Sequence, residues 1–221
     1  MLLIVAMVVL DQQAQAKKKP KIQVVQIHEP DSSWILSSDI NQYDQSTYSN
    51  VSIEYSGKDG FDIGVSSQNI PVSGNRSQNF EYDTFLQVSK TFKVNQFDIS
   101  AGTGNGYSPS QNGKLHSISY ADILYDTGSI FKIHYGIYYV NKTLSTINNH
   151  IGFVSGFIVG NDDLYIQTDY FSGHNNVSGA QSAIYYSPYP FIKAYTGVLV
   201  PEKNSGNEFA GVIGVQWVFN K

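Results

Sequence analysis

The chain has 221 residues and a formal net charge of -4, and its length requires no more than one domain. It contains no cysteine, which excludes a disulfide scaffold, a cysteine-ligated zinc site, a thiol nucleophile and a cysteine-linked lipid anchor. Charged residues make up only 14%, against roughly 25% in a typical soluble domain, which favours a protein with a non-aqueous solvent over part of its surface. The only basic run is Lys17–Lys19, so no nucleic-acid partner is expected.

The N-terminus has the pattern of a secretory signal. Residues 2–10 form a nearly unbroken apolar run, followed by Ala14-Gln15-Ala16, an A-x-A cleavage pattern, although no positive charge precedes the run. The run is too short to span a bilayer, which takes roughly twenty residues. We therefore predict a signal peptide over 1–16, a periplasmic segment over 17–31 and one folded domain over 32–221. A frayed apolar N-terminus is the alternative.

From position 34 onward the chain repeats short runs in which apolar and polar residues alternate. In the clearest run, 131–139, isoleucine and aromatic residues occupy the odd positions, and Lys132 and His134 share the even positions with Gly136 and Tyr138. Side chains of a strand point alternately to opposite faces, so this pattern predicts a strand with one apolar and one polar face. Similar runs lie at 34–40, 51–56, 61–66, 82–89, 97–102 and 164–171. The run 151–160 is apolar or glycine on both faces, and its orientation is not predicted.

The connections between these runs alternate in length. Tight turns are expected at 57–60, 93–95, 126–129, 160–163 and 187–190, and longer polar connections at 42–47, 67–78, 104–113, 141–150, 172–181 and 201–207. Transmembrane barrels have this asymmetry, with short periplasmic turns and longer external loops. The sequence thus predicts an all-β fold, an antiparallel up-and-down transmembrane β-barrel of about twelve strands, with about eight or ten strands as alternatives. A secreted β-sandwich binding protein is the rival, because its strands alternate too.

Two segments carry a family resemblance. The C-terminal strand 211–219 ends on Phe219 and looks like the terminal strand that the barrel-assembly machinery recognises, although Asn220 and Lys221 follow it. Residues 50–56 and 60–65 look like the first hairpin of porins. The chain therefore resembles small Gram-negative outer-membrane β-barrel porins. This resemblance implies an outer-membrane location, outer-membrane lipid and the barrel-assembly machinery as partners, and passage of small solutes.

The polar face of the strands supplies the candidate functional residues. A charge facing lipid at mid-membrane costs roughly 2–4 kcal/mol, so the charged residues on the polar parity are expected to face the interior. The set comprises Asp39, Glu54, Asp62, Asp83, Asp98, Asp122, Lys132, His134, Asp169 and Lys193. One interpretation is a polar channel for passive passage of small hydrophilic solutes, whose acidic excess disfavours anions. The other is a structural or surface-binding barrel with a filled interior.

The sequence provides no catalytic constellation, and neither a cofactor nor a metal is expected. Leu115-His116-Ser117 superficially resembles the His/Ser site of outer-membrane lipid hydrolases, but adjacent residues of a strand point to opposite faces. His116 and Asp122 share a face yet stand six residues apart, roughly 20 Å along a strand, which is too far for a dyad. We therefore expect a protein that is not an enzyme.

Overall fold

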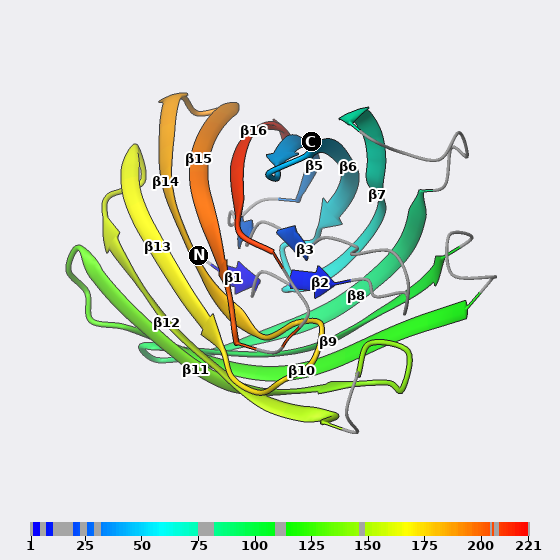
Figure 1. Cartoon of the computed structure of the whole chain (residues 1–221). Coiled ribbons are helices and arrows are strands. Elements are labelled where there is room, and N and C mark those ends of the chain that lie inside the picture. Colours follow the sequence, from blue (N-terminus) through cyan, green and yellow to red (C-terminus); the bar gives the residue numbers. More distant parts are fainter. Residues whose placement is uncertain are drawn as a thin grey trace.

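The chain folds into a closed antiparallel β-barrel (Figure 1). The computed structural model describes residues 32–74, 82–108, 114–145, 149–203, 205 and 208–220, together with four short strands near the N-terminus. Twelve strands form the barrel, each paired with its neighbours in the chain, and the last pairs with the first to close the wall. The predicted up-and-down barrel of about twelve strands is confirmed, and the β-sandwich is wrong.

The strands of the barrel run in chain order around the wall. They are β5 (Ser33–Gln42), β6 (Ser46–Ser56), β7 (Phe61–Gly74), β8 (Asp83–Val94), β9 (Phe97–Ser108), β10 (Lys114–Asp126), β11 (Phe131–Val140), β12 (Ile151–Gly160), β13 (Leu164–Phe171), β14 (Gly179–Tyr189), β15 (Ile192–Pro201) and β16 (Ala210–Asn220). The described residues include no helix of the length and hydropathy needed to cross a membrane.

The two faces of the wall differ as the alternation predicts. Large apolar side chains such as Ile63, Ile133 and Ile166 are exposed on the outside, whereas the adjacent residues Asp62, His134 and Gln167 are buried on the inside. Aromatic pairs also join neighbouring strands on the outside near the short-turn end, for example Trp34 with Tyr55, whose ring centroids are 5.3 Å apart. An apolar exterior with aromatic residues toward its ends is the surface that transmembrane barrels present to lipid.

The structure shows which face of strand β12 points into the barrel, and a glycine on that face explains why. Gly152 and Val154 are buried, whereas Ile151 and Phe153 are exposed. A Cβ on Gly152 would overlap the ring of Tyr138 on β11, so the absent side chain makes room for that ring inside the barrel. The pattern could not be read from the sequence because small and apolar residues occupy both faces.

Several predicted connections are wrong in extent. The expected long connection 42–47 is only 43–45, because Gln42 pairs with Thr47 across the hairpin and its side chain accepts a hydrogen bond from the Thr47 hydroxyl at 2.7 Å. Strands β7 and β9 continue into the polar stretches expected as loops, and β14 runs through an irregular pairing to Tyr189. Polar residues therefore extend the wall at its rim rather than ending it.

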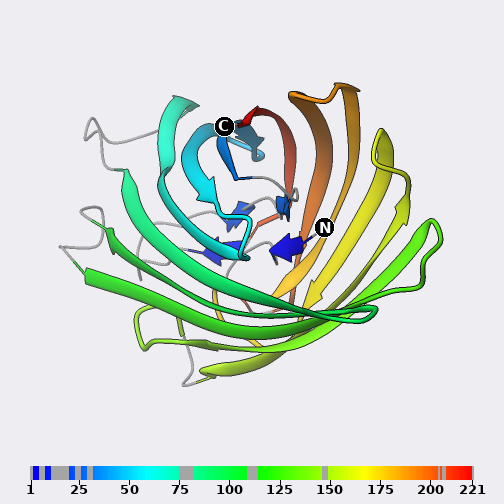
Figure 2. The ribbon, with the colours of Figure 1, turned by 180° about the vertical axis from the view of Figure 1, so that it is seen from behind.

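The N-terminal segment contributes β1 (Leu2–Ile4), β2 (Val8–Leu10), β3 (Pro20–Ile22) and β4 (Gln26–His28), paired as β1–β4 and β2–β3. Figures 1 and 2 show these short strands within the circumference of the barrel. The predicted cleavage point after Ala16 lies outside the described residues, as does much of the predicted periplasmic segment 17–31. The signal peptide therefore stays a prediction.

Candidate channel interior

The charged residues predicted to face inward all lie on the inner parity of their strands, but they form several separate groups. Eight are buried, namely Asp39, Glu54, Asp62, Asp83, Asp98, Asp122, His134 and Asp169. Lys132 and Lys193 are partly exposed. Lys132 lies near the short-turn end, where its Nζ is 2.9 Å from the carboxylate of Asp126. Lys193 lies over the ring of Tyr165, 5.7 Å from the centroid.

The first group is a bridge across four strands, from β10 to β13. The Nδ1 atom of His134 lies 3.2 Å from Oδ1 of Asp122, and its Nε2 atom lies 2.6 Å from Oδ1 of Asp169. Two glycines permit this arrangement. A Cβ on Gly136 would lie 2.7 Å from the Asp122 carboxylate, and one on Gly156 would lie 2.5 Å from the Asp169 carboxylate and overlap the imidazole.

The net charge of the Asp122–His134–Asp169 bridge follows from its geometry. A neutral imidazole has one N–H donor, whereas the protonated ring has two. Because both ring nitrogens of His134 face carboxylate oxygens, the two contacts are satisfied together when the ring is protonated or when one carboxyl holds a proton. In either case the three residues together carry a net charge of -1.

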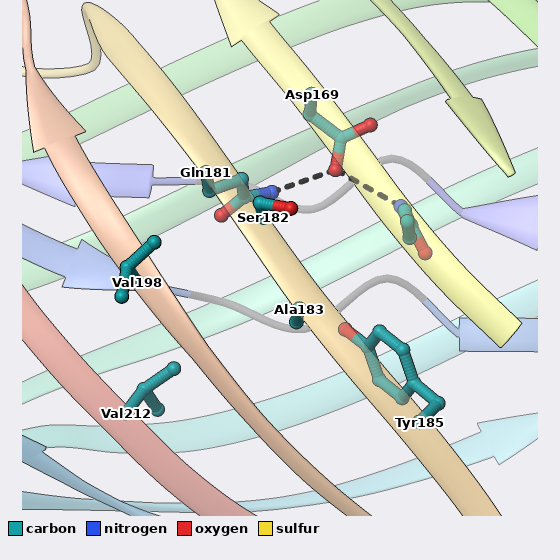
Figure 3. Close-up of a pocket in the computed structure, with 8 residues that line it drawn as sticks. Asp169, Gln181, Ser182, Ala183, Tyr185, Val198 and Val212 are labelled. Atoms are coloured by element: carbon teal, nitrogen blue, oxygen red, sulfur yellow. Dashed lines mark hydrogen bonds between the residues drawn. The ribbon is translucent and has the colours of Figure 1, made fainter.

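The bridge continues into two amides. Oδ2 of Asp169 accepts hydrogen bonds from Nε2 of Gln167 and from Nε2 of Gln181, both at 2.9 Å (Figure 3). Both side-chain oxygens of these glutamines are buried, and neither has a hydrogen-bond partner among the residues that the structure describes. Burying such acceptors costs free energy unless something donates to them.

A second group lies around Asp39. Its carboxylate accepts hydrogen bonds from Asn41 at 2.6 Å and from Asn50 at 2.7 Å, and from the Tyr195 hydroxyl at 3.3 Å. Asn50 in turn accepts a hydrogen bond from the backbone N–H of Asn69, at 3.0 Å. Asn69 has a φ of 57°, at an irregularity in the pairing of β6 with β7, and asparagine tolerates this left-handed conformation.

A third group lies toward the short-turn end. The carboxylate of Asp62 accepts hydrogen bonds from Ser56 at 2.6 Å and from Ser89 at 3.3 Å. Beyond this end, Asp59 lies in the turn after β6, where the hydrogen bond from the Lys90 ammonium holds the pKa of its carboxyl below the ordinary value.

Aromatic rings fill another part of the interior. Tyr165, Tyr185 and Tyr195 are buried and directly opposed on β13, β14 and β15, with ring centroids 4.6 and 5.4 Å apart. Gly214, the next position in this row, leaves room for the ring of Tyr195. The tyrosines were visible in the sequence on the inner parity, but their alignment depends on the register of three strands.

The long-connection end is also well packed over β10–β14. Leu144, from the connection after β11, and Val177, from the connection after β13, are fully buried. The backbone N–H of Asn176 donates to the Leu144 carbonyl at 2.9 Å, which ties these two connections together. The sequence predicted both as long polar connections and did not indicate that they pack inward.

The histidine and serine of the hydrolase-like tripeptide do not meet. His116 is buried and contacts the ring of Phe85, whereas the hydroxyl of Ser117 donates to Asn105 at 2.9 Å on the other face of the wall. Among the residues that the structure describes, no group of three or more His, Cys, Asp or Glu side chains could hold a metal ion.

No family model matches the chain, and no curated protein matches its sequence. Solved structures share its fold. A KdgM porin in complex with disordered oligogalacturonate is similar over 84% of this chain and 99% of its own, with a TM-score of 0.63 and 14% identity. A NanC porin has a TM-score of 0.58 and 14% identity, over 85% of this chain and 99% of its own.

Outer membrane phospholipase A from Escherichia coli also has a related fold, with a TM-score of 0.51 and 11% identity over 86% of this chain and 92% of its own. The fold that these structures share with the chain is that of outer-membrane barrels. The resemblance predicted from the sequence is thus confirmed at the level of fold, which serves porins and an enzyme alike.

Proposed function

We propose that the protein is an outer-membrane channel for passive passage of small hydrophilic solutes. The observation that carries this proposal is the two-faced wall, with an apolar exterior suited to lipid and an interior of buried polar and charged groups. Membranes admit strands only as closed barrels, in which every backbone group is paired. The likeness of the fold to porins supports the same function.

The charges of the interior favour cations over anions. Seven of the ten proposed lining residues are acidic and three are basic, and of the basic residues Lys132 is paired with Asp126 and His134 bridges two of the seven carboxylates. Oligogalacturonate, the ligand named with the KdgM porin, is a polyanion. This chain shares that fold but presents carboxylates inward, so we expect it to disfavour such a ligand.

Reconstitution of the purified protein into a planar bilayer tests the channel. We expect discrete conductance steps and, in a KCl gradient, a reversal potential that shows preference for K⁺ over Cl⁻. Absence of conductance from correctly folded protein would remove the proposal, and preference for Cl⁻ would overturn the part assigned to the carboxylates.

A structural or surface-binding barrel with a filled interior is the second candidate. It is favoured by the near-complete burial of inward groups such as Asp83 and Asp169, by the packed Leu144 and Val177, and by the short N-terminal strands within the barrel. Strands β1 and β2 belong to the predicted signal peptide. Comparing the conductance of the whole chain with that of residues 17–221 separates a removable obstruction from a permanently filled interior.

The assembly route belongs to the same proposal. Strand β16 closes the barrel against β5 and carries the exposed Phe219 one residue before its end, so its recognition by the barrel-assembly machinery is consistent with its place in the wall. Depletion of that machinery is expected to leave the protein unfolded in the periplasm, and normal assembly without it would contradict this partner.

A further inference from the structure

A hollow lies in the inner wall beside Asp169, and its origin is visible in the strand register. Gln167, Ala183, Gly197 and Val212 are directly opposed in turn on β13, β14, β15 and β16. The two middle positions carry almost no side chain. The neighbouring row on one side contains the stacked tyrosines, and the row on the other contains Asp169 and Gln181.

This hollow has a polar and an apolar side. Its polar side is formed by Gln167, Asp169 and Gln181, and its apolar side by Ala183, Val212 and the ring of Tyr185. Ser182 and the exposed Val198, on the outer parity of β14 and β15, border it from within the wall. The hollow includes a cavity of about 10 Å³, room for about one water molecule (Figure 3). In Figure 3 the side-chain nitrogen of Gln181 points to Asp169, and its oxygen points away from that carboxylate.

The acceptors of the hollow are fixed by the bridge. Oδ1 of Asp169 contacts His134, and its Oδ2 accepts from both glutamine amides, so each amide is held with its nitrogen toward Asp169. The oxygens of Gln167 and Gln181 consequently remain as buried acceptors, with no donor in the described part of the chain. A ligand here must therefore bring hydrogen-bond donors.

Charge and size narrow the ligand further. The Asp122–His134–Asp169 bridge carries a net charge of -1 immediately behind the two amides, which favours a cation over a neutral donor. Calcium and magnesium need about six or more oxygen ligands, far more than two amide oxygens supply. A primary ammonium has three N–H donors on a compact head, and the apolar side of the hollow suits the carbon attached to it.

We propose that this hollow binds the primary ammonium head of a cationic solute, with the oxygens of Gln167 and Gln181 as acceptors and the Asp122–His134–Asp169 bridge as the counter-charge. The inference rests on the proposed function in one respect, since a solute must be able to enter the barrel. It goes beyond that function by naming the class of solute, a small primary amine.

Binding of methylammonium chloride to the purified full-length protein in detergent tests the proposal without relying on conductance. Calorimetric titration, at constant ionic strength in tetramethylammonium chloride, measures the affinity against a background cation that has no N–H donor. We expect saturable binding that Gln181→Leu weakens about tenfold or more, because an acceptor for a charged donor is lost.

Two further variants separate binding from folding. Ala183→Val leaves both amides in place but fills the hollow, so binding should also weaken. Gln87→Leu is the matched control, because it makes the same substitution on the inner parity of β8, on the opposite side of the barrel from β14. It should leave the affinity unchanged. Each variant is first shown to be folded by the mobility of unboiled protein in SDS gels.

The outcomes distinguish this proposal from the channel. Methylammonium that does not bind, or that binds equally to Gln181→Leu, Ala183→Val and the control, overturns the site even if the protein conducts. Sodium that binds in place of methylammonium assigns the hollow to a bare metal ion and overturns the ammonium site. Saturable methylammonium binding without any conductance supports the site and removes only the channel.

Discussion

His134 occupies a position in which removal of one side chain leaves two carboxylates uncompensated. Its ring contacts Asp122 on one side and Asp169 on the other, and all three residues are buried. We expect His134→Ala to lower the free energy of unfolding by about 3–5 kcal/mol, as removal of one partner from a buried ion pair does. Urea unfolding of the protein in lipid vesicles measures this loss.

The double variant His134→Ala/Asp122→Asn supplies the control for that measurement. Neutralising one of the two carboxylates should recover part of the stability, so the combined loss is smaller than the sum of the two single losses. Strictly additive losses would show that His134 and Asp122 do not interact in the folded barrel.

Gly156 illustrates a constraint of shape at the same scale. A Cβ there would meet the imidazole of His134 and the carbonyl of Thr168. We expect Gly156→Ala to destabilise the barrel by about 1–3 kcal/mol, the usual cost of overpacking a tight site. Gly211→Ala is the control, since a Cβ on Gly211 would have no neighbour within 4 Å among the described residues. Equal unfolding curves for the two variants would contradict the tight fit at Gly156.

A single strand, β11, tests the assignment of faces. Ile133 is 43% exposed on the outside and His134 is buried inside. We expect Ile133→Lys to reduce the yield of folded protein in membranes, because a lysine facing lipid at mid-depth costs about 2–4 kcal/mol. His134→Lys keeps a positive charge between Asp122 and Asp169 and should be tolerated better. Folded yield in the membrane fraction gives the comparison, and the reverse order would mean that the faces are assigned wrongly.

The alternation of apolar and polar residues in β11 was sufficient to predict both faces of that strand, because successive side chains of any extended backbone point to opposite sides. The bridge through His134 was not predictable in the same way. Asp122 lies on the preceding strand, diagonally from His134, and Asp169 lies two strands further along. Their meeting depends on the register of three strand pairs, and no single run of sequence contains that information.

The same limit applies to the hollow and to the strand ends. Ala183 and Gly197 are unremarkable small residues in the sequence, and they create space only because the register places them side by side. Gln42 and Thr47 are polar, and their polarity was interpreted as a loop although they form the last pair of a hairpin. Polar residues at the rim indicate that the side chains there face water. They do not indicate where backbone pairing, and with it the strand, ends.

Closure of the wall is a property of the whole molecule, and it rests on the pairing of the last strand with the first. Strand β16 pairs with β5 along its length, from Gly211 opposite Gln42 to Asn220 opposite Ser33. This pairing leaves neither strand as an unpaired edge of the barrel. We expect unboiled protein in SDS gels to migrate differently from boiled protein, because a closed barrel resists the detergent until it is heated.

Deletion of 210–221 removes β16 and exposes the edges of β5 and β15, so the heat-modifiable form should be lost. Deletion of Lys221 alone, beyond the last paired residue, should retain it. A heat-modifiable form that survives the loss of β16 would show that the barrel closes by another pairing.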